Sequence, residues 1–345
     1  MQEPNLRQAT RVYAQADDTR AWIELAASLI VYVASIAISL TNYQTLWILI
    51  PSLLVTTGMG LRIYMIHHDL LHQSFFNGRK TNVIVGTLIS PIAMTPYKAT
   101  RRVHNLHHTY VNDLDHRHES FEIPVMTLRE WQAAGFWQRI YYRIYRSPLI
   151  LVFIGPFLLY AIIRRFPIRM SSFGIGDLMI CNVLIAAYGF GMYWMAGWTG
   201  VLIWLIPIYL ACAFGGFIPY VLHNFEDVEM GVKPDFDFET AALNGSSVLD
   251  WGWLFHIVTM NIAYHDLHHL NAKIPGYALP KAHADLEAKG LISPKRVTFM
   301  EGVRSLRWKL YDEENGRMIP FPAAISEPVW GGSTQNIYSQ NNQQI

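Results

Sequence analysis

The sequence is poor in charged residues and in cysteine. Charged side chains make up 15% of its 345 residues, whereas an ordinary soluble domain has about 25%. The charges nearly cancel, to a net of +1 at pH 7, so nothing in the balance indicates a nucleic-acid partner. Cys181 and Cys212 are the two cysteines, and both lie in apolar runs. We therefore expect no disulfide framework and two buried packing thiols. The low content of charged residues indicates that lipid surrounds much of the chain.

The two ends of the chain also lack the features of a folded or targeting segment. Residues 1–20 contain no basic stretch followed by an apolar core, so we expect no signal peptide. Residues 323–345 are rich in Gln, Asn, Ser and Gly, a composition that cannot bury a core and predicts a disordered tail. The remainder, 1–322, is expected to form a single membrane domain.

Long hydrophobic runs are the dominant positive feature, since 52% of the residues are hydrophobic. A helix needs about 20 apolar residues to cross the hydrocarbon of a bilayer. Four runs meet that length, and the predicted spans are 22–41, 45–66, 177–197 and 201–222. Short uncharged links, Thr41 to Gln44 and Trp198 to Gly200, join them in pairs. The sequence therefore predicts two transmembrane helical hairpins.

The basic residues outside these runs predict the orientation. Those that flank the apolar runs are Arg7, Arg11, Arg20, Arg79, Lys80, Lys98, Arg101, Arg102, Arg164, Arg165 and Arg169. The positive-inside rule places these segments, and with them both termini, in the cytoplasm. We therefore predict an all-α integral membrane protein with four transmembrane helices and a helical cytosolic cap formed by 67–176 and 223–322.

Two further apolar runs are shorter and contain proline. Residues 83–97 include Pro91 and Pro96, and residues 148–163 include Pro156. Both runs are flanked on each side by basic residues, so a crossing would break the charge bias. We expect re-entrant or interfacial segments, which need protein to cover their backbone. The alternative for 148–163 is a short true span.

Most of the 14 histidines fall into three clusters beside the predicted spans. The clusters are His67, His68 and His72; His104, His107 and His108; and His265, His268 and His269. On a helix, the HxxHH spacing is expected to aim three imidazoles at one point. A lone histidine is usually a surface residue, but so many at ligand spacing near hydrocarbon indicate function.

The number of imidazoles indicates two metal ions. One zinc takes three or four protein ligands, so eight or nine histidines exceed the needs of one ion. Imidazole suits zinc, copper, iron and nickel. Spacing alone leaves the choice among these metals open.

The histidine segments resemble the membrane fatty-acid desaturase superfamily. HDLLHQSFF is similar to its first histidine box, RRVHNLHHTYVND to its second and NIAYHDLHHLNAKIPGY to its third. HNFED, which begins at His223, resembles the family's additional histidine segment. The resemblance covers about residues 50–322. The long return after the third box is similar to acyl-lipid enzymes of the omega-6 or delta-12 kind. The sequence departs from the common pattern at three positions. Relatives often have Cys and Gly in place of Leu70 and Leu71, and an aromatic residue in place of Thr100.

The resemblance implies a helical fold whose cap holds two irons and uses dioxygen and two electrons to make a cis double bond in a long acyl chain. The implied ligands are His68, His72, His104, His107, His108, His223, His265, His268 and His269. Metal-bound imidazoles usually donate their other N–H to a neighbouring carboxylate or carbonyl. The candidates for such a role are Asp69, Asp113, Glu226, Asn261 and Asp266. His67, His116, His118, His256 and His283 fall outside the pattern.

The implied partners are a long-chain acyl group, membrane lipid and a separate electron donor. The haem-binding His-Pro-Gly-Gly signature is missing from the chain, so a ferredoxin or a cytochrome b5-like protein is expected to bring the electrons. Lys98, Arg101 and Arg102 are candidates for docking an acidic donor. Candidates for lining an acyl tunnel are Trp251, Trp253, Tyr264 and Tyr277, although interfacial aromatics are also ordinary membrane anchors.

Two alternative functions remain open. A related di-iron hydroxylase or ketolase, acting on a carotenoid, sterol or alkane, would insert oxygen instead of removing two hydrogens. A non-enzymatic membrane metal-binding or transport protein would carry its ligands near the midplane of the bilayer, whereas these clusters lie at the ends of spans. The HNFED segment and the long return favour desaturation. The position of the double bond, the acyl carrier, the donor and the oligomeric state are left open.

Overall fold

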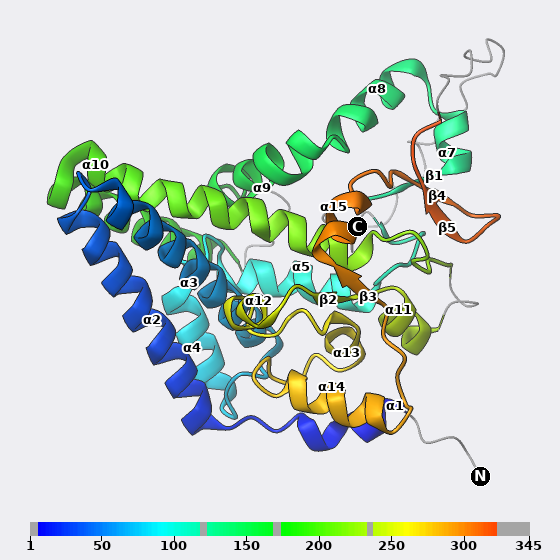
Figure 1. Ribbon diagram of the computed structural model, residues 1–345, viewed down its shortest axis with the longest axis horizontal. Helices are drawn as coiled ribbons and strands as arrows, with labels where there is room; N and C mark the ends of the chain where they lie inside the picture. Colours follow the sequence, from blue (N-terminus) through cyan, green and yellow to red (C-terminus); the bar gives the residue numbers. More distant parts are fainter. Residues whose placement is uncertain (1–5, 118–122, 168–173, 233–236, 323–345) are drawn as a thin grey trace.

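The computed structural model describes residues 6–117, 123–167, 174–232 and 237–322. His118, Arg169 and the expected disordered tail, 323–345, lie outside these residues. Most of the described chain is helical, and Figure 1 shows the shorter elements gathered to one side of the long helices. Within these residues, three helices are long and apolar enough to cross a membrane: α2 (Asp18–Thr41), α3 (Leu46–His72) and α10 (Ile175–His223).

The first hairpin, α2 with α3, is held by small polar side chains. The Asp17 carboxylate accepts the Arg20 N–H at 3.0 Å and so caps the start of α2. Between the two helices, the hydroxyls of Ser39 and Ser52 lie 2.7 Å apart. Such small residues allow helices to pack closely where the hydrophobic effect gives little help. The helix α3 continues six residues beyond the predicted span, because its end is the first histidine cluster.

Helix α10 folds back on itself and forms the second hairpin. As one straight rod, its 49 residues would extend roughly 74 Å at 1.5 Å per residue. The helix breaks at Ala196 and Gly197, where Gly197 has a φ of +57°, a conformation that suits glycine. Tyr188 and Trp204, from the two halves, have ring centres 5.5 Å apart. The turn therefore lies just before the predicted link at residues 198–200.

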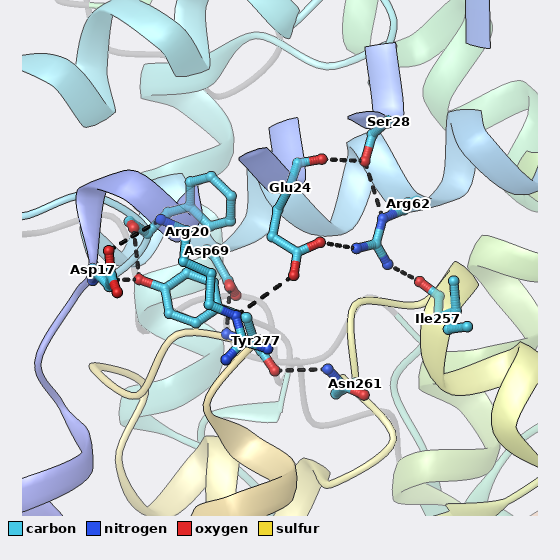
Figure 2. Close-up of polar contacts among 11 residues, drawn as sticks. Asp17, Arg20, Glu24, Ser28, Arg62, Asp69, Ile257, Asn261 and Tyr277 are labelled. Carbon is cyan, nitrogen blue, oxygen red and sulfur yellow. Dashed lines mark hydrogen bonds and ion pairs between the residues drawn. The ribbon is translucent and has the colours of Figure 1, made fainter. Parts of the chain in front are cut away.

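One charged residue of the predicted span 45–66, Arg62, connects three helices. Its Nη2 lies 2.6 Å from a carboxylate oxygen of Glu24 in α2, and its Nε donates to the Ser28 hydroxyl at 3.0 Å. Its Nη1 donates to the carbonyl of Ile257 in α12 (Trp253–Val258). Figure 2 shows these groups around the guanidinium. The charge is thus fully paired, as a charge near hydrocarbon must be.

The two proline-containing runs adopt different structures. In the first, α4 (Arg79–Ile89) ends before Pro91, and α5 (Tyr97–Thr109) begins directly after Pro96. The carboxylate of Asp177 accepts the Lys98 N–H at 2.8 Å and so caps the first turn of α5. The run 83–97 is therefore a helix, a turn and the start of a second helix.

The second run is a bent, irregular helix. It consists of η2 (Leu149–Ile154), α9 (Gly155–Phe157), η3 (Leu158–Ile162) and η4 (Ile163–Arg165), and η2 and η3 have π-helical turns. Pro156 lacks an N–H, which disturbs regular helix, and its ring faces Gly216 of α10. The segment bends by 56° from α8 (Phe136–Tyr145). That shape is compatible with a broken span and with a re-entrant segment.

The remaining short helices form a layer to one side of the long helices (Figure 1). They are α1 (Leu6–Ala9), η1 (Thr10–Tyr13), α7 (Leu128–Ala133), α11 (Phe238–Asn244), α13 (His265–Leu270), α14 (Leu279–Ala288) and α15 (Phe299–Ser305). The N-terminal segment belongs to this layer, because the Tyr13 hydroxyl donates to Asp285 of α14 at 3.0 Å. Cys181 and Cys212 are both buried, as predicted.

The expectation of an all-α fold is wrong in detail, because the described residues include five short strands. Strand β4 (Leu310–Asp312) pairs in parallel with β1 (Met126–Thr127) and antiparallel with β5 (Arg317–Ile319). A separate parallel pair joins β2 (Val248–Asp250) to β3 (Arg296–Thr298). Strands of two or three residues are too short to show alternation in a sequence. Their effect is to fasten the return after α14 to earlier segments.

The hairpin turns generate a prediction about topology. Single cysteines at Tyr43 and Trp198, which are 41% and 73% exposed, should react with a membrane-impermeant thiol reagent in intact cells. A cysteine at Phe166, 56% exposed and just after η4, should react only after permeabilisation. External labelling at Phe166 would contradict the predicted arrangement, since it would make 148–163 a true span.

Candidate metal centre

The nine proposed ligand histidines lie at or near the C-terminal ends of α3, α5 and α10 and along the short helix α13, which begins at His265. His68 and His72 close α3, and His223 is the last residue of α10. The second cluster, His104 to His108, ends α5, and the third, His265 to His269, forms most of α13. The C-terminal end of a helix carries partial negative charge, which favours a cation beside it. Four such ends at one place therefore favour bound metal.

The nine imidazoles form two compact groups. The first nitrogen group contains His68, His72, His104, His108 and His268, and the second contains His107, His223, His265 and His269. Within each group, the available ring nitrogens all lie within 4.8 Å of one another. The Nε2 atoms of His72 and His104 are 2.8 Å apart, and those of His223 and His265 are 3.0 Å apart.

Each HxxHH cluster divides between the two groups instead of aiming at one point. In α5, His104 and His108 belong to the first group, whereas His107 belongs to the second. In α13, His268 belongs to the first group, whereas His265 and His269 belong to the second. Successive residues on a helix differ by about 100° in direction, so adjacent histidines diverge while those at i and i+4 align. The rings of His108 and His269, one from each group, lie 4.3 Å apart between centres. Two sites thus share the same pair of helices.

The donor set fits a transition metal or zinc. Both groups consist of imidazole alone, which suits zinc, copper, iron and nickel rather than the oxygen-seeking calcium or magnesium. Burial, followed by the neighbouring imidazoles, lowers the pKa of His104, His108, His265, His268 and His269 well below the usual 6.5. The rings are therefore neutral, and a neutral imidazole has the lone pair that a metal needs.

His223 is oriented by the chain that faces its other nitrogen. Its Nδ1 donates to the carbonyl of Gly245 at 3.0 Å, which leaves Nε2 directed to the second group. A metal ligand is commonly held in this way. The position of Gly245 in the sequence gave no signal of this role, because the contact depends on how the loop after α11 folds back.

Two of the predicted supporting residues, Asp69 and Asn261, bind the backbone of the same residue, Gly276. The carboxylate of Asp69 lies 3.6 Å from Nδ1 of His68 and accepts the Gly276 N–H at 2.7 Å. The Asn261 amide donates to the Gly276 carbonyl at 2.9 Å. A Cβ at Gly276 would lie only 2.4 Å from the Met260 carbonyl oxygen, so glycine is required there. Figure 2 shows Asp69 and Asn261 beside Tyr277.

The other three predicted supporting residues have different contacts. The Asp266 carboxylate lies 3.3 Å from Nε2 of His283, and both side chains are 1% exposed. Asp113 lies 3.0 Å from Nδ1 of His116, while the Glu226 side chain is exposed. Asp266 therefore braces α13 against α14 through His283, a histidine that the cluster pattern did not single out.

Two cations close the end of α3. Arg101 donates to the carbonyl of Leu71 at 2.9 Å, and Lys273 donates to the carbonyl of His72 at 2.6 Å. Cations stabilise the C-terminal end of a helix in this position. Burial, together with the charges of Arg101 and Arg79, lowers the pKa of Lys273. Arg101, expected on the donor-facing surface, thus has a role in holding the first histidine cluster.

A narrow apolar cavity of about 40 Å³ lies below the first group, between α2, α3 and α10. Tyr64 and Leu61 line it from α3, one and two turns below His68 on the same helical face. Cys212 and Ile208 line it from α10. The four aromatic residues expected to line a tunnel, Trp251, Trp253, Tyr264 and Tyr277, do not line this cavity.

On the opposite side, an open depression of about 330 Å³ reaches the imidazoles from the surface. It is lined by His108 of the first group and His269 of the second, together with Arg7, Thr109 and Phe238. The centre is therefore approached by a narrow cavity from the side of the long helices and by a surface depression from the other.

Comparison with known proteins places this centre in a family. The sequence model described as "Fatty acid desaturase" matches residues 44–299. The chain is 29% identical to a "Fatty acid desaturase" of Bacillus subtilis (strain 168), over 95% of this chain and 93% of the relative. It is 26% identical to an "sn-1 oleoyl-lipid 12-desaturase" of Synechocystis, over 78% and 76%. It is 22% identical to an "sn-1 acyl-lipid omega-3 desaturase (ferredoxin)" of Nostoc, over 71% and 69%. The match spans all three histidine clusters, and the chain therefore belongs to the fatty acid desaturase family and is an oxidoreductase.

Proposed function

We propose that this protein introduces a cis double bond into a long acyl chain at a di-iron centre on the cytoplasmic face of a membrane. The observation that carries the proposal is the pair of imidazole groups at the ends of four helices, one with five histidines and the other with four. In this arrangement the two halves of α10 count as separate spans, so that four helices cross the bilayer. The cap, formed by 67–176 and 223–322, then lies in the cytoplasm with both termini.

The first nitrogen group would hold one iron and the second group the other. When bound, the two irons supply the oxidising power to remove hydrogen from an unactivated methylene. The overall reaction balances: two neighbouring methylenes lose two hydrogens, dioxygen takes these with two electrons and two protons, and two waters form. The chain's own task is to keep the imidazoles neutral and fixed, to orient the acyl chain and to exclude bulk water from the reacting carbons.

The acyl chain is proposed to lie along the faces of α3 and α10 that lead away from the imidazoles. Tyr64 follows His68 down α3, and its hydroxyl is 2.9 Å from that of Tyr160. Below this tyrosine pair lies the apolar cavity, with room for the end of a hydrocarbon chain. A lipid-linked substrate is favoured because the Synechocystis and Nostoc relatives are named as lipid desaturases.

The reaction consumes two electrons per double bond, and a separate protein is proposed to supply them. The name of the Nostoc relative includes ferredoxin, and we propose a ferredoxin or a cytochrome b5-like protein as the donor. The depression that His108 and His269 line gives an approach to both groups from the surface. Arg7 lines this opening and Arg102 is exposed on the nearby α5, so an acidic donor would be attracted there.

The proposed reaction predicts a defined product. Expression in a host with simple lipids should yield a fatty acid two hydrogens lighter than its precursor, with dioxygen and iron both required. His107→Ala and His268→Ala should reduce this product to background and still insert into the membrane. Asn105→Ala, on the exposed face of α5, is the matched control and should retain activity. A product heavier by one oxygen would instead indicate a hydroxylase.

His223 is the proposed ligand outside the three clusters, and it generates a separate prediction. His223→Gln should lose one iron preferentially, because changes at or next to metal ligands typically weaken binding about 10–100-fold or more. His256→Gln is the control: His256 is half-buried against Tyr264, with ring centres 5.0 Å apart. Iron per chain and desaturase activity are the measurements. Two irons retained in His223→Gln would return this residue to a structural role.

A further inference from the structure

Arg146, at the end of α8, is a buried cation that contacts the end of α10. Only 1% of its surface is exposed. Its Nη2 donates to the side-chain oxygen of Asn224 at 2.7 Å and to the carbonyl of Trp308 at 3.3 Å. The guanidinium lies 5.1 Å from the ring centre of Tyr220. The residue that follows His223 is thus tied to α8 by a charged hydrogen bond, which is among the stronger kinds.

A second buried cation, Lys309, lies beside Arg146. Its Nζ donates to the Arg146 carbonyl at 2.6 Å, and 7% of its surface is exposed. Burial and the charge of Arg146 lower the pKa of Lys309 to about 8. The groups that act on Arg146 electrostatically are tyrosines, with no carboxylate among the contacts of either cation in the described residues. Two cations buried in this way carry a large desolvation cost, which indicates a role beyond general packing.

The contacts of these cations converge on the last turn of α10. The Asn224 amide donates to the Ser305 carbonyl at 3.2 Å, and the Tyr220 hydroxyl donates to the Trp308 carbonyl at 2.8 Å. From α8, the Tyr142 hydroxyl donates to the Lys309 carbonyl at 2.7 Å. The segment 305–309 is therefore fastened between α8 and the helix end that carries His223.

The opposite side of the same turn is held by the loop after α11. The Ser247 N–H donates to the Leu222 carbonyl at 3.0 Å, and Gly245 accepts from the His223 ring. Asn224 itself has non-helical backbone angles, φ −136° and ψ 70°, and ends the helix. His223 thus lies between two restraints, one on its ring and one on the residue that follows it.

We propose that Arg146 is a positioning residue for the second nitrogen group: through Asn224 it fixes the last turn of α10 so that Nε2 of His223 faces His265 and His269. The inference rests on the proposed ligation by His223. Ligand geometry tolerates only small displacements, so loosening this turn should weaken the second metal site more than the first.

The chain offers a matched control in Arg139. This arginine is also on α8, is 7% exposed, and donates to the carbonyls of Trp131 at 3.0 Å and Gln132 at 2.7 Å, both in α7. Removing it should disturb the same helix at its other side, away from the histidines. Arg139→Met therefore measures the general cost of losing a buried arginine from α8.

The test compares Arg146→Met, Arg139→Met and His223→Gln in the purified full chain, without assaying turnover. Iron per chain is measured after equilibration at defined free iron, and the thermal midpoint is measured on the iron-depleted proteins. Arg146→Met should lose one of two irons, with about 10–100-fold weaker binding of that iron, as should His223→Gln. Arg139→Met should show a lowered midpoint but keep both irons.

Each other result decides the question. Two irons in Arg146→Met beside one in His223→Gln would overturn the positioning role and leave the ligation intact. Two irons in His223→Gln would overturn the ligation itself. Loss of one iron in Arg139→Met as well would show that the effect is general to α8. Where Arg146→Met fails to fold, Asn224→Ala cuts the same link and keeps the cation; retention of both irons there would overturn the inference.

Discussion

Nine imidazoles within a few ångströms of one another, beside apolar helices, are the constraint on which the rest of this structure depends. Ring nitrogens packed so closely are poor partners for each other without a cation, and burial lowers the pKa of several of them, His265 and His269 among them. Six of them, His72, His107, His108, His223, His268 and His269, lie in the last turns of α3, α5, α10 and α13, where the helix ends favour positive charge. Metal binding would then relieve the crowding that folding imposes.

Holding four helix ends at one point requires restraints that are not themselves ligands. Arg101 and Lys273 close α3, Asp177 starts α5, and the chain around Gly245 orients His223. Asp69 accepts the Gly276 N–H and Asn261 donates to the Gly276 carbonyl, which ties the loop after α13 to the end of α3. These are mostly charged or backbone hydrogen bonds in buried surroundings, where an unpaired group is costly. The centre is therefore built by the connecting segments as much as by the helices.

The membrane side of the molecule meets a different requirement, because backbone and charge must be satisfied internally in lipid. Arg62 is paired with Glu24 and with the end of α12, and the irregular helix around Pro156 packs on Gly216. The same contacts that satisfy these groups bring α12 and α9 against the long helices. The segments beside the long helices are therefore packed closely and hydrogen-bonded to one another. The narrow cavity beside Tyr64 lies among them, and an acyl chain that approaches the imidazoles would meet it there.

The sequence by itself determined the helical hairpins, the nine clustered or paired histidines and the family, because hydrophobic runs and i, i+4 spacing are local signals that survive without knowledge of the fold. It predicted that each HxxHH cluster would converge on one point, whereas the structure divides each between two groups, since adjacent residues on α5 and α13 face different neighbours. It also missed the short strands, the roles of Gly276, Gly245 and His283, and the buried Arg146 and Lys309. Each of these depends on segments far apart in the chain coming together, and only the tertiary structure decides which distant partner a buried polar group meets.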